Sequence, residues 1–255
     1  MNNILAIAHK EVKSYFASPI APIVIGLFAL LFGYFFYAML VYFDRQSMQL
    51  AGLGGGPGAN VNEQMIRPVF LNASVILLFF MPSITMRTYS EEKRSGTIEL
   101  LLTSPVTDFQ IIMGKFLGAM ALYAAMIGVT VIHMAILYMF GKPEWIPIAM
   151  TYLGLLLMGG CFISVGLLIS SMTRNQIIAA IATFGVFLLL WVINWIGSFT
   201  GPRTQDVLNY LSIPDHLDDF TRGILDTKHL VYYVSFMTFA LFLTMRSVDT
   251  ERWKG

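Results

Sequence analysis

Six long apolar runs constrain the fold of this chain more than any other feature of its sequence. A helix needs about 20 apolar residues to cross a hydrocarbon core of roughly 30 Å. Six runs approach or exceed that length, at residues 20–43, 69–86, 111–140, 149–170, 177–197 and 229–245. The sequence therefore predicts an all-α integral membrane protein with six transmembrane helices. The third run is long enough to tilt or to pass the membrane interface.

The composition agrees with lipid as the main solvent. Charged residues make up only 12% of the chain and hydrophobic residues 56%, whereas soluble domains carry about 25% charged residues. A net charge of +1 argues against nucleic-acid binding, which requires a basic face. The single cysteine, Cys161, lies in an apolar run and excludes a disulfide framework or a thiolate metal cluster. The 16 methionines are scattered, which favours packing over soft-metal binding.

A charged segment separates the second run from the third. Residues 91–94 carry four charges in a row, and placing them near the bilayer centre would cost on the order of 10 kcal/mol. Residues 89–103 contain no proline and many good helix formers, and Pro105 is expected to end that helix. Thr107 and Gln110 have the spacing of a capping box that starts a new helix. The segment 87–107 is thus placed to carry force between a partner in the water and the spans.

The string EEKRSGTIELLLTSPVT at residues 91–107 resembles the cytosolic loop between the second and third spans of ABC-2 type exporter permeases. The resemblance is closest to gliding-motility-type and nitrous-oxide-reductase-maturation-type ABC permeases. Residues 220–226 (FTRGILD) and 242–247 (FLTMRS) are similar to the corresponding segments of these permeases. The resemblance implies a single ABC-2 type transmembrane domain over residues 1–255, with 87–107 as its cytoplasmic coupling segment.

The resemblance also implies that a separate ATPase docks on the coupling segment. The chain has no Walker A string, so ATP and Mg would bind to an ATPase subunit in trans, and this chain would be a non-catalytic subunit without a cofactor. Two ATPases enclose two nucleotides, so a second permease copy or a homologue is expected as a dimer partner. In the gliding-motility group, a protein with an extracytoplasmic domain is a further implied partner. The expected coupling residues are Glu91, Glu92, Lys93, Arg94, Gly96, Thr97, Ile98, Glu99, Leu101, Leu102 and Pro105.

The distribution of Lys and Arg predicts the orientation. Ten of the 16 would lie on one side and six on the other, which places both termini and the coupling segment in the cytoplasm. The resemblance implies that the membrane is a bacterial inner membrane. The first apolar run lacks a clear cleavage site, so no cleavable signal peptide is expected.

Three polar segments lie outside the runs. Residues 1–18 place their apolar side chains on one face of a helix, ended by Pro19, which predicts an interfacial helix; permeases of the resembled type begin with such an elbow helix. Residues 44–68 are predicted to form an external loop with a glycine-rich linker. Residues 198–228 are predicted to form two short amphipathic helices, broken at Pro214, in an external re-entry segment. Its clustered aspartates lack calcium-loop spacing, which favours a solvated acidic face.

No catalytic or metal-binding set is visible. Gly-x-Ser-x-Gly and His-Glu-x-x-His strings are absent, and the four histidines lie far apart in the sequence. Asn72, His133 and Asn194 are polar residues inside apolar runs. They are candidates for lining a transport pathway, and hydrogen bonding between helices is the alternative. Gly114 and Gly118 would permit close approach of another helix.

Other functions stay open beside an ATP-driven transport subunit. A secondary transporter would need a buried ion site near the midplane, and no run contains a carboxylate for proton or sodium coupling. An intramembrane enzyme would need a catalytic set. An ABC-type complex that drives assembly or mechanical work, without moving a solute, is not distinguished from a transporter by these residues.

Overall fold

The computed structural model describes residues 2–52, 60–99, 105–198 and 201–252, and the regular elements in these ranges are all helices. Six stretches are long and apolar enough to cross a membrane: Ile20–Gln49, Asn62–Ser95, Asp108–Phe140, Trp145–Met172, Gln176–Ile193 and Thr227–Thr250. Each contains most of one predicted run. The predicted all-α class with six candidate spans is therefore confirmed.

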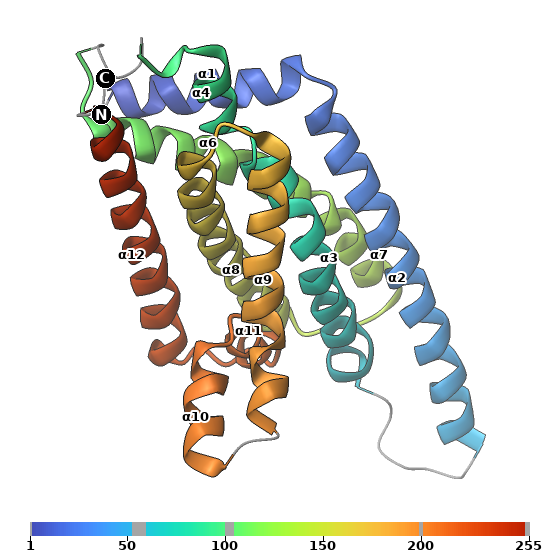
Figure 1. Ribbon diagram of the computed structural model, residues 1–255. Coiled ribbons are helices and arrows are strands. Elements are labelled where there is room, and N and C mark those ends of the chain that lie inside the picture. Colours follow the sequence, from blue (N-terminus) through green and yellow to red (C-terminus); the bar gives the residue numbers. More distant parts are fainter. Residues whose placement is uncertain (1, 53–59, 100–104, 199–200, 253–255) are drawn as a thin grey trace.

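Long helices connect two ends of the molecule; most of them run side by side, and the run at residues 108–140 crosses obliquely (Figure 1). They are α2 (Ile20–Gly52), α3 (Arg67–Thr85), α6 (Asp108–Gly128) continued by α7 (Thr130–Phe140), α8 (Trp145–Met172), α9 (Gln176–Ser198) and α12 (Thr227–Arg252). In the most apolar stretch of each span, the buried share is 72% for α8 and 61% for the span that contains α3. The same share is 22% for α2 and 17% for α9. The core therefore lies around α8 and α3, and α2 and α9 present most of their surface to lipid or to another subunit.

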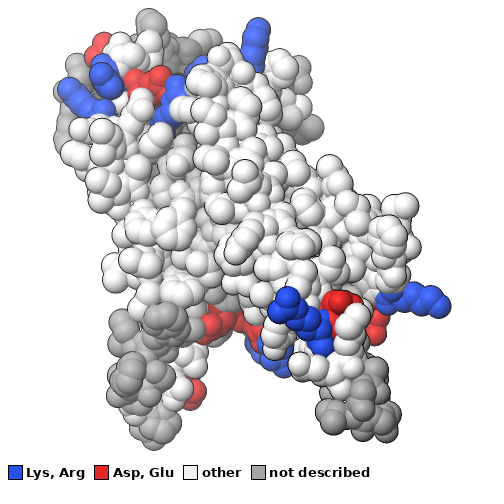
Figure 2. Space-filling view, turned by 90° about the vertical axis from the view of Figure 1, so that its right-hand side faces the viewer, with Lys and Arg blue, Asp and Glu red and all other residues white. Residues whose placement is uncertain are grey.

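The two ends of the molecule differ in what they carry. Both termini, the helix α1 (Asn2–Ala17) and the short helix α4 (Ser90–Ser95) lie at one end, which we call the α4 end (Figure 1). The short helices α10 (Pro202–Leu211) and α11 (Asp215–Thr221) lie at the other, the α11 end. Figure 2 shows charged residues near these ends and a broad uncharged band between them. Such a band suits the hydrocarbon core, where charged side chains are costly.

Two predicted boundaries are wrong. The expected loop over residues 44–68 is largely helical: α2 continues to Gly52, because neither proline nor glycine interrupts residues 44–51, and a π-helical turn, η1 (Asn62–Ile66), leads directly into α3. The expected helix over residues 89–103 is interrupted, because α4 ends at Ser95 and Gly96 takes a left-handed conformation. Other local predictions are confirmed, since α10 and α11 flank Pro214 and Thr107 and Gln110 form the capping box of α6.

Candidate functional site

The helix α4 is fixed to the end of α8. The backbone N–H groups of Tyr89 and Ser90 both donate to Ser170 Oγ, at 3.1 Å each. Lys93 Nζ donates to the carbonyl oxygen of Ser171. A six-residue helix is unstable in isolation because nucleation is costly, so these contacts with α8 hold α4 in its folded form.

Arg87 fixes the chain where it enters α4. Its guanidinium donates to both carboxylate oxygens of Glu91, at 2.8 and 3.2 Å. This forked geometry gives a stronger and more directional contact than a single ion pair. Arg87 Nη1 also donates to Ser18 Oγ at 3.1 Å, so the same side chain links α4 to the turn between α1 and α2.

Residues 94–97, which we call the α4 tip, face outward. Arg94, Ser95, Gly96 and Thr97 are all exposed, whereas the following Ile98 is only 8% exposed. Gly96 has a φ of 74°, a conformation that costs roughly 1–2 kcal/mol for a residue with a Cβ atom. A tight turn with one cationic and two hydroxyl side chains therefore projects from the α4 end.

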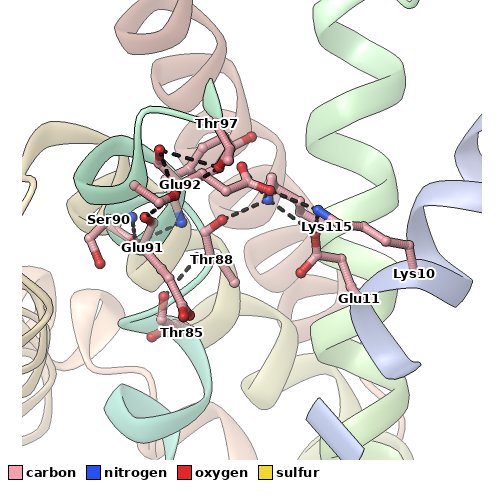
Figure 3. A network of polar contacts seen from close by, with 12 residues as sticks. Lys10, Glu11, Thr85, Thr88, Ser90, Glu91, Glu92, Thr97 and Lys115 are labelled. Carbon is pink, nitrogen blue, oxygen red and sulfur yellow. Dashed lines mark hydrogen bonds and ion pairs between the residues drawn. The ribbon is translucent and has the colours of Figure 1, made fainter. Parts of the chain in front are cut away.

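A buried lysine joins α1, α4 and α6 behind this tip (Figure 3). Lys115 Nζ of α6 lies 3.1 Å from Glu11 Oε1 of α1 and 2.8 Å from Glu92 Oε2 of α4. It also donates to the Thr88 carbonyl oxygen at 2.6 Å. Lys10 of α1 donates to the other oxygen of Glu92 at 2.8 Å. We call Lys10, Glu11, Glu92 and Lys115 the charged cluster.

The charged cluster is largely withdrawn from water. The Lys115 side chain is 1% exposed, and those of Glu11 and Glu92 are 10% and 14% exposed. Charges are tolerated at such burial only when each is paired and hydrogen-bonded, as they are here. Lys10 is 58% exposed; burial lowers its pKa, but the hydrogen bonds and attraction of Glu92 and Glu11 outweigh this and raise the pKa above its ordinary value.

Two glycines let α1 lie directly on α6. A Cβ atom added to Gly114 would lie 2.6 Å from Ile7 Cβ, and one added to Gly118 would lie 2.5 Å from Glu11 Cβ. Both distances are shorter than carbon atoms can tolerate. The close approach expected from the Gly114–Gly118 spacing is therefore present, and its partner is α1. It also brings Glu11 within reach of Lys115.

The predicted coupling residues fall into three groups. Those exposed at the surface are Arg94, Gly96, Thr97, Glu99 and Pro105. Those turned inward or paired within the chain are Glu91, Glu92, Lys93 and Ile98. Leu101 and Leu102 lie outside the described residues. The sequence interpretation did not single out Lys10, Glu11 or Lys115, although a lysine inside an apolar run was a usable signal.

The polar residues expected inside spans have different surroundings where their side chains are described. His133 of α7 packs edge-on against Phe32 and Phe36 of α2, with ring centroids 5.2 Å apart in both cases. Asn72 is half-buried on α3, and the side chain of Asn194 lies outside the described residues. The position of His133 therefore supports a role in packing α7 against α2. By contrast, His216 and His229, which are 13 residues apart in the sequence, touch at the α11 end.

The sequence matches the model of ABC-2 family transporter proteins over residues 5–248. The chain belongs to this family. As an ABC-2 permease it is a multi-pass membrane subunit without a catalytic role of its own. The chain is similar to the probable multidrug ABC transporter permease YbhR of Escherichia coli (strain K12), at 28% identity over an alignment of 189 residues that covers 68% of this chain and 50% of that relative. YbhR of Escherichia coli O157:H7 gives the same values. The chain thus spans about half the length of the curated relatives it matches.

Proposed function

We propose that this ABC-2 permease couples ATP hydrolysis by a separate ATPase subunit to export or other extracytoplasmic work. The observation that carries the proposal is that the exposed α4 tip is connected to the charged cluster, which joins α1, α4 and α6. An exposed turn alone would be a surface loop. A turn tied by buried ion pairs to three helices can transmit a displacement to the spans, because buried charges resist separation.

The ATPase docks on the α4 tip, with Arg94 and Thr97 as its polar contacts and Glu99 beside them. Its movement reaches α6 through Glu92 and Lys115, which lie 2.8 Å apart. It reaches α8 through Ser170, which accepts two backbone hydrogen bonds at the start of α4. The inward-facing Glu92 thus serves transmission, and its role differs from that of the exposed Arg94.

The cellular arrangement is part of the same proposal. Both termini and the α4 end face the cytoplasm of a bacterial inner membrane, as the excess of Lys and Arg near that end favours. Two permease chains, as a homodimer or with a homologue, pair with two ATPase subunits that bind ATP and Mg. The gliding-motility-type resemblance of residues 91–107 supports a further partner with an extracytoplasmic domain. Transport of drugs, which the name of YbhR states for that relative, is the alternative work.

The test is purification of the tagged permease from native membranes, followed by detection of co-purifying ATP-binding protein and of its ATPase activity in lipid. Arg94→Glu reverses the charge of the α4 tip. Lys142→Glu is the matched control, because Lys142 is exposed in the turn between α7 and α8, and this turn lies at the α11 end (Figure 1). We expect Arg94→Glu to reduce the recovered ATPase and Lys142→Glu to leave it unchanged. Failure of any ATP-binding protein to co-purify with the wild-type chain would overturn the proposal.

Glu92→Gln separates docking from transmission. This variant keeps the α4 tip intact but removes the charge that pairs with Lys115 and Lys10. We expect the ATPase to remain bound while its activity no longer responds to the permease. Release of the ATPase by Glu92→Gln, with no effect of Arg94→Glu, would assign docking to the inward-facing residues and contradict the division of roles.

A further inference from the structure

Two buried histidines meet at the α11 end. His216 of α11 is 4% exposed and His229 of α12 is 6% exposed, and their Nδ1 atoms lie 2.6 Å apart. The outer nitrogen of each ring also has a partner. His216 Nε2 lies 2.9 Å from the carbonyl oxygen of Tyr210 in α10, and His229 Nε2 lies 2.7 Å from Asp219 Oδ2. One chain of hydrogen bonds therefore links α10, α11 and α12.

Counting protons along this chain fixes the charge of the pair. Both outer nitrogens face atoms that only accept hydrogen bonds, a carbonyl oxygen and a carboxylate oxygen, so each must carry a proton. The two inner nitrogens face each other and form a hydrogen bond only if they share one proton between them. The chain is thus satisfied by three protons on two rings. Two neutral imidazoles carry two protons in total, so the observed contacts require one extra proton and a charge of +1 on the pair.

Any other proton count breaks a contact. With two protons, either an outer nitrogen meets its acceptor without a hydrogen or the two inner nitrogens meet lone pair to lone pair. With four protons, two N–H groups point at each other across 2.6 Å, and two positive rings share a site with little access to water. A buried polar group that is unsatisfied or repelled is costly, because it has lost its hydrogen bonds to water without gaining others.

The surrounding charges match a single positive charge. Asp219 lies against His229, and Lys228 Nζ lies 3.8 Å from the same carboxylate oxygen and 3.0 Å from Asp226. Asp215 begins α11, and the aromatic neighbours from α10 and α12 are Tyr210, Tyr232 and Tyr233. Burial lowers the pKa of His216, helped by its neighbours His229 and Lys228 and opposed by the Tyr210 carbonyl and Asp219. A second extra proton is therefore disfavoured.

We propose that His216 and His229 form a proton-binding site that takes up one proton between the two rings and thereby holds α10 and α11 against α12. The site does not depend on the proposed transport function. Two further bonds, from Tyr232 to the Leu211 carbonyl oxygen at 2.8 Å and from Tyr233 to the Ile213 carbonyl oxygen at 3.0 Å, keep the segment attached when the proton count changes. Gain or loss of a proton therefore loosens this end of the permease without releasing it.

The test is nitrogen NMR of the wild-type permease labelled with ¹⁵N-histidine, in detergent micelles or lipid nanodiscs. The chain has four histidines, so the spectrum contains few ring signals. A shared proton produces scalar coupling between ring nitrogens of two different residues. We expect this cross-peak at about pH 7 and its loss on acidification well below the ordinary histidine pKa of about 6.5. Assignment uses His216→Gln, which removes the cross-peak, and His133→Gln, which retains it.

A second variant tests the role of the carboxylate. Asp219→Asn removes the negative charge beside His229 while preserving the shape of the side chain, so the extra proton is held less tightly. As the pH is raised, the cross-peak of Asp219→Asn should therefore disappear at a lower pH than the cross-peak of the wild type. Absence of inter-residue coupling from about pH 5 to 8 in the wild type, with each ring titrating independently near the ordinary value, would overturn the proposal.

Discussion

Replacing Lys115 with methionine should destabilise the α4 end more than any replacement of an exposed lysine. Lys115→Met keeps the length of the side chain and removes the charge. It leaves Glu11 and Glu92, which are 10% and 14% exposed, without their shared partner. The Thr88 carbonyl oxygen also loses its donor at 2.6 Å. Two carboxylates of like charge then face each other in a site with little water.

The expected magnitude follows from the burial of the cluster. Removing one partner of a buried ion pair typically costs about 3–5 kcal/mol, because the other charge is left uncompensated. Lys10 still lies 3.3 Å from Glu11 and 2.8 Å from Glu92, so the lower end, about 3 kcal/mol, is expected here. On the scale of soluble chains of this size, that loss corresponds to a fall of roughly 6–12 °C in the unfolding midpoint.

The assay is thermal unfolding of the purified permease in one detergent, with Lys13→Met as the control, because Lys13 is exposed on α1. The double variant Lys115→Met/Glu92→Gln removes the uncompensated charge as well. We expect its loss to be smaller than the sum of the two single losses, since residues in one ion-pair network are coupled. Equal shifts for Lys115→Met and Lys13→Met would refute the account of the charged cluster.

Three further outcomes are expected. Gly96→Ala places a Cβ atom at a φ of 74° and should lower the free energy of unfolding by about 1–2 kcal/mol. Gly128→Ala is the control, because Gly128 lies in a helix with open space around it, and it should not lower the stability. Equal unfolding midpoints of the two variants would contradict the left-handed turn. Gly118→Ala, whose Cβ atom would lie 2.5 Å from Glu11 Cβ, should displace α1 and expose its amides to hydrogen exchange; unchanged protection of α1 would contradict the close approach. The pKa of His216 is lowered in the folded state, which disfavours protonation of both rings, so the contribution of the histidine pair to stability is lost as the pH falls from about 6.5 through the folded-state pKa. The difference in unfolding midpoint between wild type and His216→Gln should therefore be larger at about pH 7 than at about pH 5, and an equal difference at both pH values would contradict this prediction.

The sequence predicted the features that depend on lipid and on local chemistry. The six spans followed from apolar length, and the start of α6 followed from the spacing of Thr107 and Gln110. The break in the predicted helix at Gly96 was missed because a single glycine is tolerated within helices, and only the left-handed φ shows that α4 ends there.

Long-range contacts could not be predicted in the same way. Lys115 was counted only as a charge favouring the cytoplasmic side, because its partners Glu11 and Glu92 come from segments that meet only after α1 packs on α6. Similarly, His216 and His229 are brought together by the turn between α11 and α12. The sequence showed which residues are unusual, and the packing of the helices decided which of them touch.

Cross-linking from the α4 tip to the ATPase tests the proposed coupling site most directly. The single cysteine, Cys161, is fully buried, so Thr97→Cys introduces one accessible thiol at the α4 tip. Asp206→Cys is the control, because it introduces an accessible thiol on α10, which lies at the α11 end (Figure 1). With a short thiol-to-amine reagent in native membrane vesicles, we expect Thr97→Cys, and not Asp206→Cys, to form a product with an ATP-binding protein. No such product from Thr97→Cys, while the ATPase still co-purifies, would show that the ATPase docks elsewhere and contradict the proposed coupling site.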